Sequence, residues 1–266
     1  MLARSEHVLA PVRPSAAEEA WLRSQLVREI AAMHEAVVYL IADEYRRQQE
    51  RIIAQDDSPA DRLNSSIKGL SKRWTERFDA LSQRLAEHFS QAIEKRSTVA
   101  LKRMLRKYGM SVRFTPSQGV RDIMDATVHQ SVQLIKSIPQ KYLGEVEGIV
   151  MRGVQVGRDL ATISKALQSQ FGVAKRRAHL IARDQNNKAT AAFNRTRQLE
   201  AGLDEAIWIH SSAGKTWRPS HAKAGRERTR FKIATGWFDP DEGKYIQPGE
   251  LINCRCVSRP VIKGFS

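Results

Sequence analysis

Two segments near the C-terminus decide the fold: WIHSSAGKTWRPSH at residues 208–221 and FDPDEGKYIQPGELINCRC at residues 238–256. The segments 239–243 and 247–250 combine Pro, Gly and acidic residues, which is typical of tight turns. Aromatic and β-branched residues gather between such turns and predict short strands. The strands are predicted over 205–210, 230–234, 244–246 and 257–262, so residues 204–266 are expected to form a small β-rich unit.

Upstream of Gly202 the apolar residues follow the period of helices with one buried face. A long helix is predicted from Ala16, and Ser58 before Pro59 predicts the start of a second one that ends near Gly109. Further helices are predicted over 116–136, 139–156, a short segment ending at Phe171-Gly172, and 174–201 with Gly202 as its cap. Residues 1–15 are expected to be an irregular arm. The residues predicted to face inward are Leu22, Leu26, Ile30, Met33, Val37, Leu40, Ile41, Phe78, Leu81, Leu85, Phe89, Ile93, Ile181, Ala189, Phe193 and Leu199.

These patterns predict an α+β chain whose N-terminal two-thirds is mostly α-helical, with long helices. We divide it into a long-helix region (1–110), a helical middle region (111–203) and the small β-containing C-terminal unit (204–266).

The chain of 266 residues carries a formal net charge of +15 and has a pI near 10.2. Such a balance attracts polyanions, so DNA, RNA, anionic lipid and acidic proteins are all candidate partners. No secretory signal and no membrane-spanning helix are expected, because charged residues interrupt every apolar stretch. Only two cysteines are present, one residue apart, which favours reduced thiols or metal ligands over a disulfide.

Basic residues cluster near the end of the second predicted helix. They could contact nucleic-acid phosphates without reading sequence, and a solvated helix face explains them equally well. The segment 175–197 is a second basic stretch. The DNA-contact candidates of the cluster are Lys95, Arg96, Lys102, Arg103, Arg106, Lys107 and Arg113.

Several catalytic motifs fail on spacing. Gly214-Lys215-Thr216 resembles the end of a phosphate-binding loop, but the first glycine of that motif would fall at Ile209. His34-Glu35 lacks the second histidine of a zinc-protease helix, and no Gly-x-Ser-x-Gly elbow is present. We therefore predict no catalytic residues, no cofactor-binding residues and no small-molecule substrate.

The candidate metal ligands are His221, Cys254 and Cys256, with His210 as a fourth. Thiolates and imidazole suit zinc, which is usually held by four such ligands. The alternative is that these residues hold a tight β unit without any metal. We favour the metal-free alternative from the sequence, because structural zinc sites normally show their ligands in recognisable pairs.

Two further residues are expected to hold the C-terminal unit together. Trp208, between two isoleucines, is expected to supply much of its core. Arg218 precedes Pro219, which favours an extended backbone, and its guanidinium is expected to reach a carboxylate or strand-end carbonyls. Side chains alternate along an extended segment, so Cys254 and Cys256 should share a face, and we expect His221 to meet it.

The segment from about residue 175 to 260 resembles the phage Mu F-like minor head proteins, also called the phage head morphogenesis family. The combination of Pro248-Gly249-Glu250, Asn253-Cys254-Arg255-Cys256 and an upstream Arg218-Pro219-Ser220-His221 is specific. Other matching residues are Ala182-Arg183-Asp184-Gln185, Asn186 or Asn187, Gly202, Trp208, Gly225, Phe231 and Gly236. Some members have cysteines where Arg218 and His221 stand, and many have aspartate where Gly214 stands. Residues 226–230 resemble an insertion. Some relatives carry a further toxin or enzyme domain, which is not expected here because the chain ends ten residues after Cys256.

The resemblance implies a structural, non-enzymatic minor head (capsid) protein of a tailed phage, associated with the portal and needed for head assembly and DNA packaging or delivery. The implied partners are the portal protein, the major capsid or scaffolding protein and packaged double-stranded DNA. The implied location is the virion head, with the host cytoplasm during assembly. Two alternatives stay open: a non-specific DNA-binding protein acting through basic helices, and a zinc-dependent hydrolase or nuclease.

Overall fold

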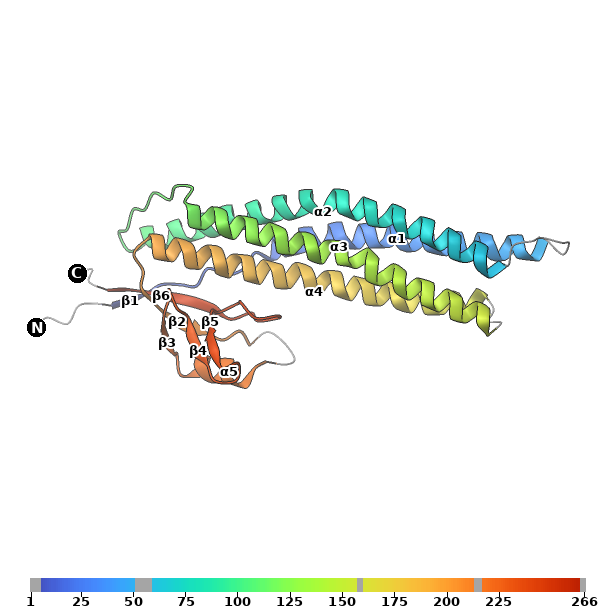
Figure 1. The fold of residues 1–266 in the computed structure, drawn as a ribbon. Coiled ribbons are helices and arrows are strands. Elements are labelled where there is room, and N and C mark those ends of the chain that lie inside the picture. Colours follow the sequence, from blue (N-terminus) through green and yellow to red (C-terminus); the bar gives the residue numbers. More distant parts are fainter. Residues whose placement is uncertain (1–5, 51–58, 157–159, 213–216, 264–266) are drawn as a thin grey trace, which may run out of the picture. The chain divides into compact units, whose positions relative to one another are not determined.

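The protein is described by a computed structural model that covers residues 6–50, 59–156, 160–212 and 217–263. Within this part of the chain, four long helices precede a region of short strands and one short helix (Figure 1). This confirms the predicted α+β class. The helices are α1 (Ala16–Glu50), α2 (Pro59–Arg106), α3 (Gln118–Gln155), α4 (Leu160–Glu200) and α5 (Pro219–Arg226), and the strands are β1 (Glu6–Val8), β2 (Glu205–Ile209), β3 (Arg230–Lys232), β4 (Trp237–Asp239), β5 (Lys244–Ile246) and β6 (Val257–Lys263).

The chain forms two compact units, each assembled from separate segments. The helical unit comprises Ala20–Ala86 and Gln130–Ala182. The strand-bearing unit comprises Met1–Glu19, Glu87–His129 and Arg183–Ser266. The three regions proposed from the sequence stay a prediction.

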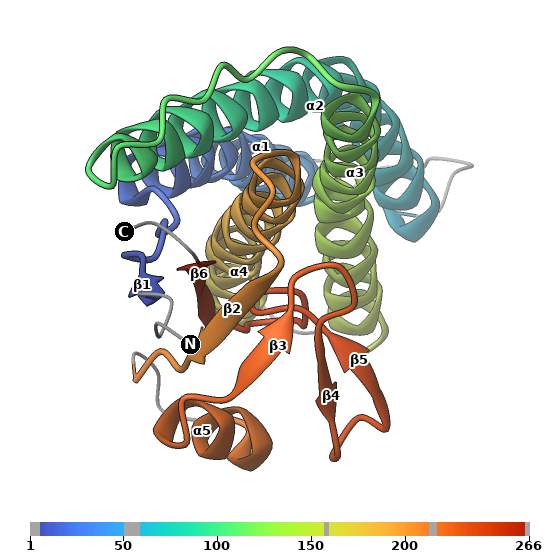
Figure 2. The ribbon, with the colours of Figure 1, turned by 90° about the vertical axis from the view of Figure 1, so that its left-hand side faces the viewer.

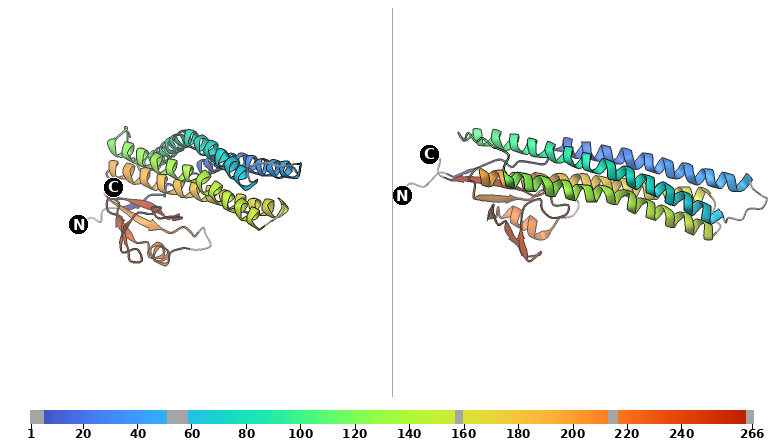
Figure 3. Two further views of the ribbon diagram at one scale, coloured as in Figure 1. Left: turned by 45° about the vertical axis from the view of Figure 1, so that its right-hand side comes forward. Right: turned by 45° about the horizontal axis from the view of Figure 1, so that its top comes forward.

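In the helical unit, segments of α1, α2, α3 and α4 run side by side (Figures 1 and 3). Their apolar stripes form its interior, as the helical period predicts, although Leu40 and Leu85 are only half-buried. His34 shows how a lone histidine is used here: its Nδ1 lies 2.6 Å from the Tyr142 hydroxyl, and its Nε2 lies 3.1 Å from Oε1 of Gln168. Its ring stacks on Phe171 at 4.3 Å between centroids. His34 is therefore a hydrogen-bonded core residue.

The predicted helix start at Pro139 is wrong, because α3 runs through this proline without ending. Proline lacks the N–H that would bond to the preceding turn and normally kinks a helix. Side chains support the backbone at this point. The Ser137 hydroxyl donates to the Leu134 carbonyl at 2.6 Å and accepts from Arg177 at 2.7 Å.

The predicted end of a helix at Phe171-Gly172 is also wrong, since α4 is continuous from Leu160 to Glu200. A glycine inside a helix costs only about 1 kcal/mol relative to alanine. Burial of Leu167, Ala174 and Ala178 on either side outweighs that cost.

Two predicted helix ends are confirmed by their caps. Gly109 and Gly202 have φ values of 75° and 73°, the left-handed conformation that glycine accepts without strain. After Gly202, the Leu203 N–H donates to the Gln198 carbonyl at 3.0 Å. The prediction that Leu199 faces inward is wrong, because Arg197 and Gln198 occupy the inward side of this turn.

Helix α3 begins at Gln118 rather than at the predicted residue 116, because the Ser117 hydroxyl caps the Val120 N–H at 3.2 Å. The start of α2 at Pro59 agrees with the prediction, although Ser58 lies outside the described residues.

The strand-bearing unit contains an antiparallel sheet with the strand order β1-β6-β2-β3, together with the hairpin β4-β5. The prediction of an irregular arm over residues 1–15 is wrong for β1, which pairs with the end of β6 so that Val8 faces Val261. Leu9 and Val12 then enter the core. A three-residue strand has no recognisable local pattern, and it forms here because a distant strand offers an edge.

The sheet lies between the C-terminal part of α4 on one side and α5 with the β4-β5 hairpin on the other (Figures 1 and 2). This confirms the predicted small β-containing unit. Helix α5 and strand β4 were not predicted, since α5 has only eight residues and β4 only three, which is too short for a recognisable pattern.

Candidate functional site

Trp208 is the centre of the core of the strand-bearing unit. It lies on the central strand β2 and has no exposed surface. Its ring centroid lies 5.0 Å from those of His221 and Trp237 and 6.1 Å from that of Phe231. One side chain therefore touches β3, β4 and α5, as expected of a large aromatic residue in a small core.

Helix α5 carries His221 to this core. Arg218 has the extended backbone expected before proline, with φ −74° and ψ 131°, and Pro219 occupies the first turn of the helix. The Arg218 guanidinium reaches the Ile252 carbonyl at 3.3 Å and the Glu242 carboxylate at 3.5 Å. Gly225 lets α5 approach β2, because a Cβ there would lie 2.3 Å from the Cβ of His210. These contacts place the first turn of α5 beside residues 247–256, the loop between β5 and β6 that carries both cysteines and is called the cysteine loop below.

The cysteine loop is held by the C-terminal half of α4. Asn253 has a φ of 62°, and its N–H donates to Asp184 at 2.8 Å while its side chain accepts from Arg183 at 2.9 Å. The Asn187 amide donates to the Cys254 carbonyl at 3.1 Å. Gly249, with a φ of 89°, leaves room for α4, because a Cβ there would lie 3.0 Å from that of Ala191. The helix therefore fixes the backbone on both sides of Cys254.

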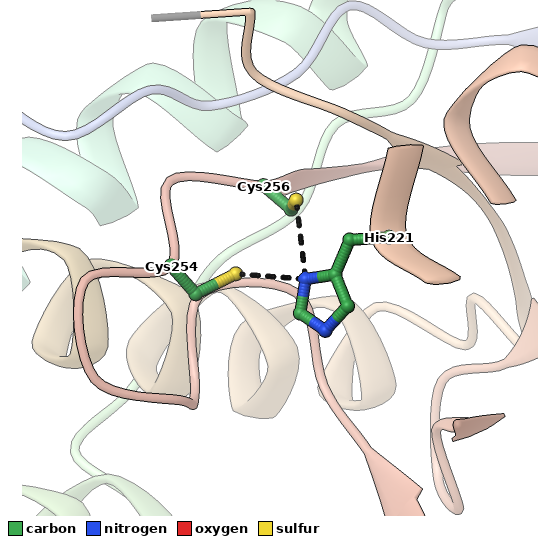
Figure 4. Close-up of side chains that lie close together, drawn as sticks. All are labelled: His221, Cys254 and Cys256. Carbon is green, nitrogen blue, oxygen red and sulfur yellow. Dashed lines mark hydrogen bonds between the residues drawn. The ribbon is translucent and has the colours of Figure 1, made fainter. Parts of the chain in front are cut away.

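His221, Cys254 and Cys256 converge in the interior (Figure 4). The His221 Nδ1 atom lies 3.5 Å from the Cys254 sulfur and 3.7 Å from the Cys256 sulfur, and all three side chains are buried. On the other side of the ring, Nε2 lies 3.1 Å from a carboxylate oxygen of Asp239, which is fully buried. The juxtaposition expected from strand alternation is thus present, and Asp239 is an addition that the sequence did not indicate.

The protonation of these groups is interdependent. The Cys256 thiol donates a hydrogen bond to the Cys254 sulfur, and this bond lowers the pKa of Cys254. Burial raises this pKa, but a further hydrogen bond from His221 lowers it again. Together these effects bring the pKa of Cys254 to about 4. The neighbouring Cys254 sulfur and burial together raise the pKa of Cys256. Burial alone lowers the pKa of His221, but Cys254 and Asp239 outweigh it and raise this pKa. The cluster thus readily carries negative charge on sulfur.

A cavity of about 370 Å³ opens beside the cluster. His221, Cys254 and Cys256 line it together with His210, Trp217 and Arg218. His210 was a predicted fourth ligand, but among the described residues it is not part of the group whose ligand atoms lie within 4.8 Å of one another. Gly214, Lys215 and Thr216 lie outside the described residues.

The polar residues on the buried side of α4 were not predicted to face inward, although residues 184–187 are among those that carry the family resemblance. Asn187 supports the cysteine loop, and Arg195 donates to the Ile233 carbonyl at 3.1 Å. A recognisable signal was present, because polar residues stand where the helical period calls for apolar ones. The buried set is Asp184, Gln185, Asn186, Asn187, Thr190, Asn194, Arg197 and Gln198.

The basic cluster predicted to contact DNA lies in the strand-bearing unit, on the last turns of α2 and the following loop. Two of its members have partners: Arg96 pairs with Glu18 at 2.5 Å, and Lys102 lies 5.8 Å from the centre of the Phe114 ring. The remaining members are exposed, and none of them forms an ion pair with a described residue. They are Lys95, Arg103, Arg106, Lys107 and Arg113.

Part of the chain that contains this site matches a known protein family. Residues 144–259 match the family described as Phage Mu protein F like protein. This region is Mu F-like. It includes all of α4, the cysteine loop, the strands β2 to β5, and the first three residues of β6. The match begins within α3, upstream of residue 175, where the resemblance was expected to begin.

A relative from Haemophilus influenzae, described as an uncharacterized protein, is 33% identical to this chain over 156 residues. The alignment covers 58% of this chain and 32% of the relative, so the chain spans about a third of the length of that relative. No solved structure matches the chain. Among the described residues, no helix has both the length and the apolar character needed to cross a membrane.

Proposed function

We propose that this protein is a structural minor head protein of a tailed bacteriophage, which acts in head morphogenesis by binding other head components. The match of residues 144–259 to the Mu F-like family is the observation that carries this proposal. The portal protein is the proposed principal partner, with the major capsid or scaffolding protein as a second. The protein is then made in the host cytoplasm and becomes part of the virion head.

An exposed aromatic pair supports a binding role. Phe238 and Tyr245, on opposite strands of the β4-β5 hairpin, are 48% and 62% exposed, and their ring centroids lie 5.4 Å apart. Exposed aromatic residues on a rigid hairpin are typical of protein–protein contact surfaces. We propose that this pair contributes to the contact with the portal.

Co-expression with the portal protein of the same phage tests this proposal. We expect the chain to co-purify with the assembled portal ring through size-exclusion chromatography. The double substitution Phe238→Ser/Tyr245→Ser is expected to weaken this association by at least about 10-fold, since aromatic interface residues each contribute about 2 kcal/mol or more when they are central.

A matched control is the substitution Tyr39→Ser in α1 of the helical unit, where the tyrosine is also largely exposed. This variant should co-purify like the parent. Absence of the parent chain from purified portal rings, and from heads assembled in its presence, would contradict the proposed function. Equal weakening by both variants would contradict the assignment of the hairpin.

A second candidate function is non-specific DNA binding, and the exposed end of α2 favours it. Lys95, Arg103, Arg106 and Lys107 present positive charge that no described carboxylate neutralises. Phosphate contacts of this kind give affinity that depends on salt and not on sequence. Such binding is compatible with a head protein that meets packaged DNA.

Charge reversal tests the DNA contact. We expect the variant with Lys102, Arg103, Arg106 and Lys107 all changed to Glu to bind duplex DNA more weakly. The slope of log K against log salt should fall by about 0.9 for each phosphate that the variant no longer neutralises, as measured by fluorescence anisotropy at several salt concentrations. The matched control reverses four exposed residues elsewhere on α2, namely Lys68, Lys72, Arg73 and Arg84, which gives the same net charge. The assignment is wrong if both variants bind DNA equally weakly.

A further inference from the structure

The cluster of His221, Cys254 and Cys256 has the dimensions of a metal-binding site. A tetrahedral zinc ion with Zn–S bonds of about 2.3 Å and Zn–N bonds of about 2.0–2.1 Å would set its nitrogen and sulfur ligands about 3.6 Å apart. The two observed Nδ1–sulfur distances are 3.5 and 3.7 Å. All three ligand atoms lie within 4.8 Å of one another, so one ion can reach all of them.

The histidine is oriented as a zinc ligand requires. Nε2 faces the Asp239 carboxylate at 3.1 Å, so the proton of a neutral imidazole is held on Nε2 and the Nδ1 lone pair points at the two sulfurs. A metal-ligating histidine usually donates its second N–H to a carboxylate in this way. The carboxylate is itself fixed, because its other oxygen accepts from the Asp241 N–H at 3.0 Å.

The His221 Nδ1 atom lies at nearly equal distances from the two sulfurs. A neutral Nδ1 can accept only one S–H, whereas a cation can be bound by Nδ1 and by both sulfurs at once. A cation between the three atoms accounts for both distances and for the burial of two thiols beside an imidazole. Soft thiolates with imidazole favour zinc over calcium or magnesium.

We infer that His221 Nδ1, Cys254 and Cys256 bind one zinc ion, which ties α5 to the cysteine loop. Asp239 is a positioning residue that orients the His221 ring. The three ligands line the cavity beside the cluster. The sequence alone favoured a metal-free cluster, and the geometry of the three ligand atoms favours a zinc ion instead. This inference is independent of the proposed head function.

The test measures metal content in the full chain. The protein is expressed with zinc in the medium, purified without chelators and dialysed against zinc-free buffer, and zinc is measured by plasma mass spectrometry. We expect about one zinc ion per chain in the parent and almost none in Cys254→Ser/Cys256→Ser. The matched control is His34→Gln, which removes a buried histidine of the helical unit and should leave the zinc content unchanged.

Two further measurements do not require the cysteine variant to fold. Asp239→Asn retains all three ligands, and its zinc affinity should fall by about 10–100-fold in competition with a chromophoric chelator. In the metal-free parent, zinc should raise Tm in a saturable manner, and cobalt(II) should produce the near-ultraviolet absorption of thiolate coordination. The inference is overturned if the parent retains no zinc and its Tm does not respond to zinc. Retention of equal zinc by the double-serine variant overturns it as well.

Discussion

Replacing Trp208 with alanine is expected to reduce the free energy of unfolding of the strand-bearing unit by about 3–5 kcal/mol, the usual cost of removing a large aromatic side chain from a core. The residue is fully buried and its ring touches those of His221, Phe231 and Trp237, so the neighbours cannot collapse into the space without moving two strands and a helix. Urea denaturation followed by far-ultraviolet circular dichroism measures the total change. Hydrogen exchange in β2 and β6 shows where it occurs.

Trp217→Ala is the matched control for this prediction. Trp217 is 58% exposed and lies at the rim of the cavity, so its replacement should change the free energy of unfolding by no more than about 0.5 kcal/mol. Equal destabilisation by the two variants would show that Trp208 is not the centre of the core.

Replacing Arg197 with methionine is expected to lower the free energy of unfolding by about 3 kcal/mol, because it leaves two partly buried carboxylates without their buried ion-pair partner. The Arg197 side chain is 5% exposed and bonds to Glu94 and Glu200 at 2.8 Å each. It also donates to the Thr115 carbonyl at 2.8 Å, and its guanidinium lies 5.0 Å from the centre of the Phe114 ring. One side chain therefore joins α2, α4 and the loop before α3.

A double-mutant cycle identifies the cause of that destabilisation. Glu94→Gln removes one of the carboxylates, so adding it to Arg197→Met should restore about 1 kcal/mol or more of the stability that the single variant lacks. Arg28→Met, at an exposed position of α1, serves as the control and should be nearly neutral. Additive effects in the cycle would mean that the ion pair with Glu94 contributes little and that packing against Phe114 dominates.

The features that the sequence predicted well are those with local causes. The long helices follow from the spacing of apolar residues, and Gly109 and Gly202 mark helix ends because their left-handed conformations suit glycine. The turns at 239–243 and 247–250 follow from residues with restricted or permissive backbones. Each of these signals is complete within a few residues, so no knowledge of the rest of the chain is needed.

Helix continuity was decided by tertiary contacts. Pro139 and Gly172 are local helix-breaking signals, and both lie inside continuous helices because neighbouring helices bury residues on either side of them. Packing of an amphipathic face contributes more to a long helix than one proline or glycine subtracts. Strand β1 shows the opposite case, since a short segment with no strand pattern becomes ordered by pairing with β6.

The candidate site also combines features that the sequence predicts with features that only the tertiary structure determines. Alternation along an extended chain was enough to predict that Cys254 and Cys256 share a face, and the sequence identified His221 as the residue to meet them. Only the folded structure shows that the Asp239 carboxylate contacts His221 and that Asp184 and Asn187 bond to the backbone of the cysteine loop. The same is true of the 3.5 and 3.7 Å distances from the His221 Nδ1 atom to the two sulfurs. They depend on how α4, α5 and the β4-β5 hairpin pack, and the contacts that fix this packing join residues far apart in the sequence.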